Sequence, residues 1–297
     1  MAGPPRPAPT AAGTSWTPPP CPSNRGPSRP HNSISAPHLG PPVQALLLEL
    51  ADAVQRAVGQ IAGDPGEVLG RGADGAPSLR IDRVAERAVL DLLAKEQVRL
   101  NVLSEEAGSI DRGGEATLVL DPIDGTHNAV RGIPFYGVSI AIGRDQLVGV
   151  EEGLVRDLVS GATYYAAKGR GATLNGRTIR VRPFDPEDSV ASVYLGTNAH
   201  PDSNRVASRA RRTRSLGSAA LELCLVARGA MDMYYLNSAV RAAELRIVDM
   251  AAGTLIVREA GGRVVDLQGR DLDLPLDLEA RTNLVAYGDP RAWEALR

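Results

Sequence analysis

The stretch VLDPIDGTHNAV, residues 119–130, determines how the rest of this sequence is interpreted. A run of apolar residues ends at Asp121, and a second carboxylate follows at Asp124. Two carboxylates this close repel each other unless a cation neutralises them or one of them takes up a proton. The dipeptides Asp-Pro and Asp-Gly are also ordinary turn signals, so a turn without chemistry is the alternative interpretation.

The position of the two acids favours chemistry. They follow a strand that is expected to be buried, and sites are often built at the carboxyl ends of strands. Gly125 and Thr126 then open a predicted helix, and free amides at a helix N-terminus bind phosphate. Mg²⁺ prefers a few carboxylates together with water and substrate phosphate. The pattern therefore predicts metal-assisted hydrolysis of a phosphate ester.

The spacing of the acids separates this motif from another phosphatase design. In that design an apolar strand ends with Asp-x-Asp-Gly-Thr, and the first aspartate is the nucleophile. Here the spacing is Asp-x-x-Asp with Pro122 after the first acid, so we expect the acids to span a turn rather than share one strand face. Water, rather than a carboxylate, is then the expected nucleophile.

The composition excludes several classes of protein. The 297 residues allow one large domain or two smaller ones, and 43% hydrophobic with 23% charged residues is typical of a globular protein. The net charge of −2 does not indicate nucleic acid or an anionic membrane as a partner. No apolar run approaches the roughly 20 residues of a membrane helix. The two cysteines, Cys21 and Cys224, form no disulfide framework or zinc site, which favours a reducing, cytoplasmic compartment.

Residues 1–42 differ from the rest of the chain. They hold 13 of the 22 prolines and three arginines but no acid. Such a segment buries too little apolar surface to offset its ordering entropy, so we expect a disordered tail. The segment lacks the apolar core of a secretory signal. A simpler alternative is that translation begins near Val43.

Residues 43–183 are predicted to form an α+β domain that carries the metal site. Amphipathic helices are expected at residues 43–61 and 78–96, separated by a Gly/Pro/Asp loop at residues 63–77. The expected strands cover residues 99–106, 116–121, 136–143, 147–155 and parts of 161–182. Asn175-Gly176 is a strong hairpin signal within the last of these, which favours an antiparallel sheet.

Residues 184–297 are predicted to form a smaller α/β domain that binds substrate. The pattern changes to alternating strands and helices after Pro183. Helices are expected at residues 218–229 and 247–262, with Gly229 and a Gly-Gly pair as stop signals. The expected strands cover residues 189–196, 232–236, 263–267 and 284–288.

Several motifs together resemble the inositol monophosphatase family of Mg²⁺-dependent, lithium-sensitive sugar phosphatases. The stretch VLDPIDGTHNAVRGIPFYGVSIAIG is similar to one family signature, and VDMAAGTLIVREAGG to the second. LSEEAG matches the metal-binding glutamate pair. GADGAPSLRIDRVAE resembles archaeal-type members, which often combine inositol monophosphatase and fructose-1,6-bisphosphatase activities. The resemblance covers roughly Val43 to Gly262 and implies a layered α/β/α/β/α sugar-phosphatase fold.

The resemblance also implies roles for particular residues. It implies two or three Mg²⁺ ions per active site, held by Glu105, Asp121, the main-chain carbonyl of Ile123, Asp124 and Asp249. It assigns catalysis to Asp82 and Thr126, which orient the attacking water, together with Glu105. It places substrate at Gly125, Thr126, Gly217, Ser218, Ala219 and Arg241. So many carboxylates in one pocket need divalent cations, so metal should also stabilise the fold.

Some of these residues also have a simpler interpretation. Asp82 lies in the helix at residues 78–96, whose apolar face is expected to hold Val84, Ala88 and Leu92, and by itself it reads as a solvated acid. Asp249 begins a helix, where an acid is favoured in any case.

Four further features are expected to have no part in the chemistry. Glu106 is expected to be a structural neighbour of Glu105, and His127 is not expected to be catalytic. Cys224 is expected to lie in the core, and the arginines at residues 209–214 are expected to form a solvated basic face.

The sequence departs from the family in the part that should choose the substrate. Val248 replaces the usual tryptophan before the C-terminal aspartate, and Ala129 replaces a phenylalanine. Ala242 stands where inositol-specific members carry a glutamate, and Glu244 is not expected to replace it. Arg241 corresponds to an arginine of archaeal-type members and is the candidate for a phosphate or hydroxyl contact.

The leading prediction is a Mg²⁺-dependent phosphatase that acts on a small sugar or polyol phosphate, with myo-inositol 1-phosphate and fructose 1,6-bisphosphate as the first candidates. One alternative is removal of the 3′-phosphate of adenosine 3′,5′-bisphosphate, although 4% aromatic residues offer few rings for a purine pocket. A second alternative is a regulatory protein that acts through RNA or protein contacts. The resemblance implies a homodimer, and neither a membrane nor nucleic acid is expected as a partner.

Overall fold

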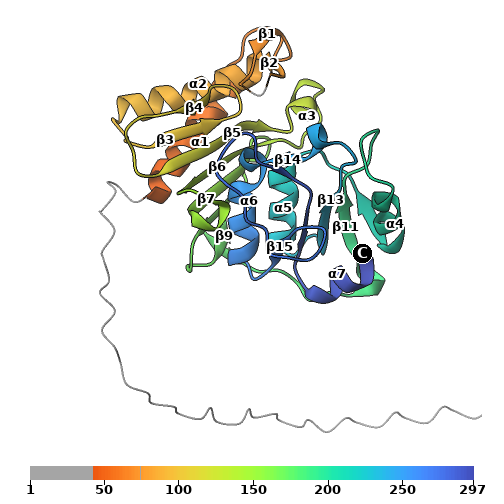
Figure 1. Ribbon diagram of the computed structural model, residues 1–297. Coiled ribbons are helices and arrows are strands. Elements are labelled where there is room, and N and C mark those ends of the chain that lie inside the picture. The colour runs from red at the N-terminus through yellow and green to blue at the C-terminus, as the bar shows by residue number, and fades with distance from the viewer. Residues whose placement is uncertain (1–42, 74) are drawn as a thin grey trace, which may run out of the picture. The chain divides into compact units, whose positions relative to one another are not determined.

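Five layers of secondary structure, in the order α/β/α/β/α, make up the folded chain (Figure 1). The structure is a computed structural model that describes residues 43–73 and 75–297. The predicted disorder of residues 1–42 lies outside the described residues. The expected α+β class and its layering are confirmed. Within the described ranges, no helix is both long and apolar enough to cross a membrane.

The first two layers are a helix pair and an eight-stranded sheet. Helices α1 (Val43–Gly59) and α2 (Arg80–Lys95) pack on each other and on one face of the sheet. The sheet has the order β10-β9-β8-β7-β6-β5-β3-β4. Its strands are β3 Asn101–Ser104, β4 Gly108–Ile110, β5 Thr117–Asp124, β6 Gly137–Gly143, β7 Val150–Asp157, β8 Thr163–Ala167, β9 Ala172–Leu174 and β10 Arg177–Ile179. Apart from the parallel pair of β3 and β5, all neighbours are antiparallel, as the sequence predicts.

The second sheet has five strands in the order β12-β11-β13-β17-β15. These strands are β11 Val190–Val193, β12 Arg212–Arg214, β13 Met233–Leu236, β15 Arg263–Val265 and β17 Leu284–Tyr287. The pairs that involve β11 are parallel, and those that involve β17 are antiparallel. Helices α4 (Asp202–Arg209) and α7 (Pro290–Leu296) pack against its outer face. All strands of the large sheet precede Pro183 and all strands of this sheet follow it, while the division into two domains stays a prediction.

The central layer consists of α5 (Ala219–Ala227) and α6 (Ile247–Glu259), which lie between the two sheets (Figure 1). Small residues let α6 approach its neighbours closely. A Cβ on Gly253 would lie 2.7 Å from Leu223, and a Cβ on Gly153 would lie 3.0 Å from Ala252. Helix α6, which carries Asp249 in its first turn, therefore packs closely against both α5 and the large sheet.

Two predictions for residues 63–96 are wrong. Residues 63–77 are not a plain loop, because β1 (Val68–Arg71) pairs with β2 (Pro77–Leu79) in an exposed hairpin. The buried face of α2 is also rotated from the expected one. It carries Ile81, Asp82, Ala85, Glu86, Val89 and Leu93, because α1 and β5 both pack against the helix and bury polar positions as well as apolar ones.

Candidate active site

Strand β5 carries both acids of the opening motif, and it does not end at Asp121. It continues to Asp124 through an irregularity, since Asp121 pairs with Ser139 and Asp124 pairs with Gly137. One extra residue therefore stands on β5 between these pairs. The amide of Ile123 donates to Oδ1 of Asp121 (3.0 Å), which fixes the bend. The prediction that the acids span a turn is therefore wrong, because they lie on either side of a bulge inside one strand. Both line the same pocket.

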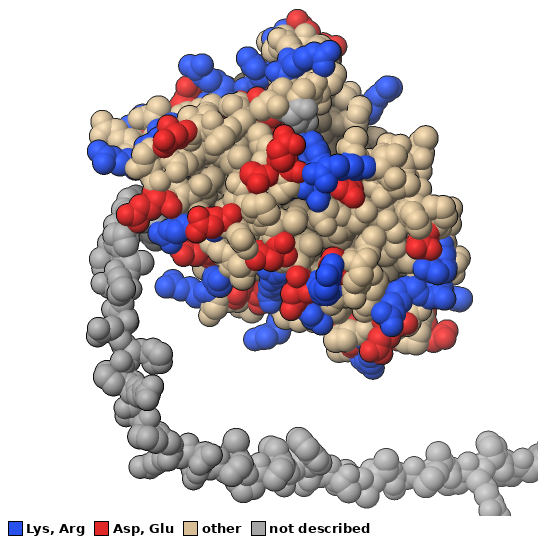
Figure 2. All heavy atoms as spheres, in the orientation of Figure 1, with Lys and Arg blue, Asp and Glu red and all other residues tan. Residues whose placement is uncertain are grey.

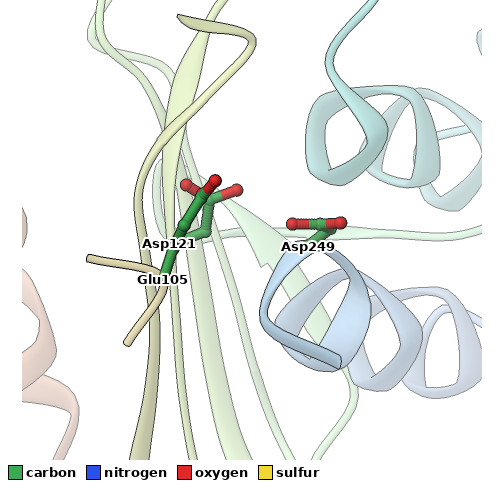
Figure 3. Close-up of side chains that lie close together, drawn as sticks. All are labelled: Glu105, Asp121 and Asp249. Atoms are coloured by element: carbon green, nitrogen blue, oxygen red, sulfur yellow. The ribbon is translucent and has the colours of Figure 1, made fainter. Parts of the chain in front are cut away.

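Three carboxylates from separate elements meet at this pocket. Glu105 follows β3, the parallel neighbour of β5, and so lies beside Asp121. Asp249 lies in the first turn of α6 on the opposite side. One oxygen from each of these three residues lies within 4.8 Å of the others. Figure 3 shows Glu105 and Asp121 side by side, with Asp249 across from them.

The electrostatics of this cluster fit a divalent cation. Burial, together with the neighbouring acids, raises the pKa of Asp121 well above its usual range. Burial also raises the pKa of Glu105 to about 7, although the Arg246 guanidinium opposes the shift. Ionising these buried carboxylates costs free energy, and a bound cation offsets that cost by stabilising the charged form. Clustered carboxylate oxygens are also the ligands that hard divalent cations such as Mg²⁺ prefer. The acidic cluster could therefore hold a metal ion.

The start of α5 holds the fourth acid, Asp124, through three hydrogen bonds. Ser218 Oγ donates to its Oδ2 (2.5 Å), and the amides of Ala219 and Ala220 donate to its two oxygens at 3.1 and 2.7 Å. Burial nevertheless raises the pKa of Asp124 to about 7. Ser218 and Ala219, predicted to contact substrate, thus hydrogen-bond to a carboxylate of the site.

Asp82 lies in the site, and its interpretation as a solvated acid is wrong. Its exposed fraction is only 6%. Thr126 Oγ1 lies 2.9 Å from Oδ1 of Asp82 and 2.9 Å from the carbonyl oxygen of Ile123. A hydroxyl has one proton, so Thr126 donates to one of these two acceptors at a time. Burial raises the pKa of Asp82 to about 7.

The turn after β5 requires glycine. Gly125 has a φ of 93°, and a Cβ there would lie 3.1 Å from the carbonyl oxygen of Gly217 and 3.2 Å from that of Phe135. Asn128 Nδ2 in α3 (Thr126–Val130) donates to the carbonyls of Phe135 and Leu216, each at 2.7 Å. The segment that contains Gly217 is therefore tied to the segment that contains Thr126.

Arg246 is the residue that the sequence analysis missed. Its Nη1 donates to Oε1 of Glu105 (2.5 Å), and its Nη2 donates to Oδ1 of Asp249 (2.9 Å). The only available signal was its place three residues before Asp249 at a helix start. Its contact with Glu105 joins positions 141 residues apart, which no local pattern reveals.

The pocket has a volume of about 1280 Å³ and extends from the acids to short elements near residues 241–246. Arg241 begins the 3₁₀ turn η3 (Arg241–Ala243), lines the pocket and donates to the carbonyl of Glu279 (3.0 Å). Glu244 also lines the pocket and accepts from Asn283 at 3.4 Å. The pocket is large enough for a sugar phosphate.

The residues that were expected to have no part in the chemistry lie outside the three-carboxylate cluster. Glu106 lines the pocket wall and accepts from Ser78, outside the three-carboxylate cluster. His127 is exposed at the pocket edge. Cys224 is fully buried in the core, as expected. On the face in Figure 2, acidic and basic side chains are interspersed.

Comparisons with known proteins agree with this architecture. A model of the inositol monophosphatase family matches residues 44–296. A fructose-1,6-bisphosphatase/inositol-1-monophosphatase of Methanothermobacter thermautotrophicus is 37% identical and covers 85% of this chain and 94% of its own. The same-named protein of Archaeoglobus fulgidus is 38% identical over 77% and 87% of the two chains. A Pyrococcus horikoshii protein described as similar to inositol-1 monophosphatase superposes with a TM-score of 0.73 at 29% identity, over 86% of this chain and 97% of its own.

Proposed function

Since this chain belongs to the inositol monophosphatase family, we propose that it hydrolyses phosphate monoesters of small sugars or polyols with Mg²⁺ as cofactor. Fructose 1,6-bisphosphate and myo-inositol 1-phosphate are the first candidates, because the names of two similar archaeal proteins combine both activities. These relatives favour neither the adenosine 3′,5′-bisphosphate phosphatase nor the regulatory alternative.

The observation that carries the proposal is the carboxylate cluster at the wall of a sugar-sized pocket. Oxygens of Glu105, Asp121 and Asp249 approach within 4.8 Å of one another. These three residues, with Asp124 and the carbonyl of Ile123, would hold two or three Mg²⁺ ions. Bound Mg²⁺ would neutralise phosphate charge and make water more acidic.

The proposed proton path uses Thr126 and Asp82. A water in the pocket would give a proton to Thr126 Oγ1 while the hydroxyl proton of Thr126 passes to Oδ1 of Asp82, 2.9 Å away. The water oxygen would then form a bond to phosphorus as the bond from phosphorus to the ester oxygen breaks, and the leaving oxygen would take up a proton from solvent water to become the free hydroxyl of the sugar or polyol. Backbone amides of Gly125 and Thr126 would hold the phosphate at the start of α3. Gly217, Ser218, Ala219 and Arg241 would lie beside the sugar or polyol.

Assembly and location extend the proposal. We expect a homodimer in the cytoplasm, with a small phosphorylated sugar or polyol as the binding partner and no role for nucleic acid. The dimer rests on the family alone, and the location rests on the sparse cysteine content.

The test is phosphate release by the full chain from fructose 1,6-bisphosphate, myo-inositol 1-phosphate and adenosine 3′,5′-bisphosphate. Each substrate is assayed with Mg²⁺ and with EDTA. We expect rapid release from at least one of the first two substrates, and we expect EDTA to abolish it. Release that persists in EDTA, or a clear preference for the nucleotide, would contradict the proposal.

A further inference from the structure

Arg246 connects two of the three clustered carboxylates through a single side chain. Its Nη1 donates to Oε1 of Glu105 at 2.5 Å. Its Nε and Nη2 donate to Oδ2 and Oδ1 of Asp249 at 3.3 and 2.9 Å, and its backbone amide donates to the same Oδ2 at 2.9 Å. The guanidinium therefore spans the gap between the end of β3 and the start of α6.

We propose that Arg246 is a positioning residue for the metal centre, which fixes Glu105 and Asp249 in a cation-binding arrangement. This inference rests on the proposed metal-dependent function. A carboxylate has about four lone-pair sites, so each acid keeps acceptor capacity while bound to Arg246. Groups that hold metal ligands in orientation contribute to metal affinity even though they do not touch the metal.

The position of the Arg246 side chain is restricted by burial and by its place in a paired strand. Its exposed fraction is 15%, and its backbone lies in β14 (Leu245–Arg246), which pairs with β16 (Arg281–Thr282). Arg246 is also the N-cap residue of α6, and its backbone amide donates to Oδ2 of Asp249 at 2.9 Å. The guanidinium is thus anchored at its base by a two-stranded ribbon and at its tip by two acids.

The shape of the guanidinium matters as well as its charge. Arginine offers a planar fork of five N–H donors, whereas lysine is a compact point charge. The contacts here use Nε and both Nη atoms at once, on two carboxylates from different elements. A lysine at position 246 would keep the charge but would lack the fork that spans both acids.

The direction of the effect on metal binding separates positioning from simple electrostatics. A positive charge beside a cation site weakens cation binding, so removing it should tighten binding if Arg246 were only a counter-ion. If Arg246 positions the ligands, its removal should weaken binding. Arg281 is a matched control, because its Cα faces that of Arg246 in the ribbon and it lines the same pocket.

The experiment is titration calorimetry of Mg²⁺ and Mn²⁺ into the EDTA-treated, dialysed full chain and its Arg246→Met, Arg246→Lys and Arg281→Met variants. We expect the dissociation constant to rise about 10- to 100-fold in both Arg246 variants, and to stay the same or fall in Arg281→Met. The increase in Tm that Mg²⁺ produces should shrink in parallel.

Unchanged or tighter binding in Arg246→Met would overturn the inference. Affinity within about threefold of the parent in Arg246→Lys would also overturn it, because charge alone would then suffice. If Arg246→Met does not fold, the lysine variant decides. A parent chain that binds neither cation would remove the proposed function itself, whereas a binding parent with unaffected variants would remove only the role of Arg246.

Discussion

The wall of the pocket, which carries the acids, is built from buried core elements, whereas its rim is built from short elements. The wall consists of β5 and the start of α6, where Asp121 and Asp249 are 2% and 7% exposed and lie on buried elements. The rim consists of short elements, η3, the β14–β16 ribbon and the exposed β1–β2 hairpin. The difference indicates that the core fixes the phosphate chemistry, while substrate choice belongs to segments that can vary without disturbing the fold.

The largest effect should come from the wall. Asp121→Asn removes one charge of the cluster without changing its size. Phosphatase activity should fall by several orders of magnitude, more than the roughly 10- to 100-fold typical for groups behind a metal ligand. The metal-free variant should remain folded, since a buried acid with a raised pKa is replaced by a neutral amide. Activity assays and circular dichroism check both points, with the exposed Asp91→Asn as a control. Near-normal activity would contradict the proposed role of Asp121 as a metal ligand.

A smaller loss is expected at the junction of wall and rim. Thr126→Val removes the hydroxyl that lies 2.9 Å from Asp82 and preserves the shape of the side chain. Steady-state kinetics should show kcat lower by about 100-fold with little change in KM, in the range expected for lost proton transfer. Thr173→Val is the matched control, because it makes the same change on β9, away from the pocket, and it should leave kcat unchanged. A variant with unchanged kcat would refute the proposed proton path.

Stability should depend on pH and on metal through the buried acids of the site. Burial raises the pKa of Asp82, Glu105 and Asp124 to about 7. Between about pH 4 and pH 7 the folded, metal-free chain keeps protons that the unfolded chain releases, so its stability falls as pH rises through this window. Mg²⁺ should restore the stability that is lost at the higher pH. Each kcal/mol of restored unfolding free energy should raise the Tm by about 2 to 4 °C. Thermal unfolding in EDTA and in Mg²⁺, each at about pH 5 and pH 7.5, measures this dependence. Equal Tm values in EDTA at the two pH values would contradict the proposed repulsion between the buried carboxylates.

The smallest effect is expected at the rim. Arg241→Ala removes a guanidinium that already donates to the carbonyl of Glu279 (3.0 Å). Since one hydrogen bond to a charged group is worth about 1.5–3 kcal/mol, kcat/KM should drop by roughly 10- to 100-fold at most, and only for substrates that contact the rim. Comparing fructose 1,6-bisphosphate with myo-inositol 1-phosphate in the same variant measures this. An equal loss on both would indicate a role in the shared phosphate chemistry.

The part of the wall around Asp121 and Asp124 was predictable from local signals in the sequence, whereas the roles of Glu105 and Asp249 were implied only by the family resemblance. The apolar run before Asp121, the Gly-Thr after Asp124 and the helix pattern around Asp249 each lie within a short window. The parallel pairing of β3 with β5 then brings Glu105 beside Asp121.

The rest depends on packing between distant segments. Arg246 meets Glu105 only when α6 docks on the large sheet. The burial of Asp82 depends on how α2 is rotated against α1 and β5. Residues 63–77, which include most of the β1–β2 hairpin, are rich in Gly, Pro and Asp, so their composition resembles a loop.

The most direct test of the account is the position of a bound cation. Crystals of the full chain soaked in Mn²⁺ would give an anomalous difference map that locates the metal without reference to activity. The account predicts a peak coordinated by oxygens of Glu105, Asp121 and Asp249, and no such peak in Asp121→Asn. Ordered Mn²⁺ found only elsewhere, or an empty cluster at saturating Mn²⁺, would contradict it.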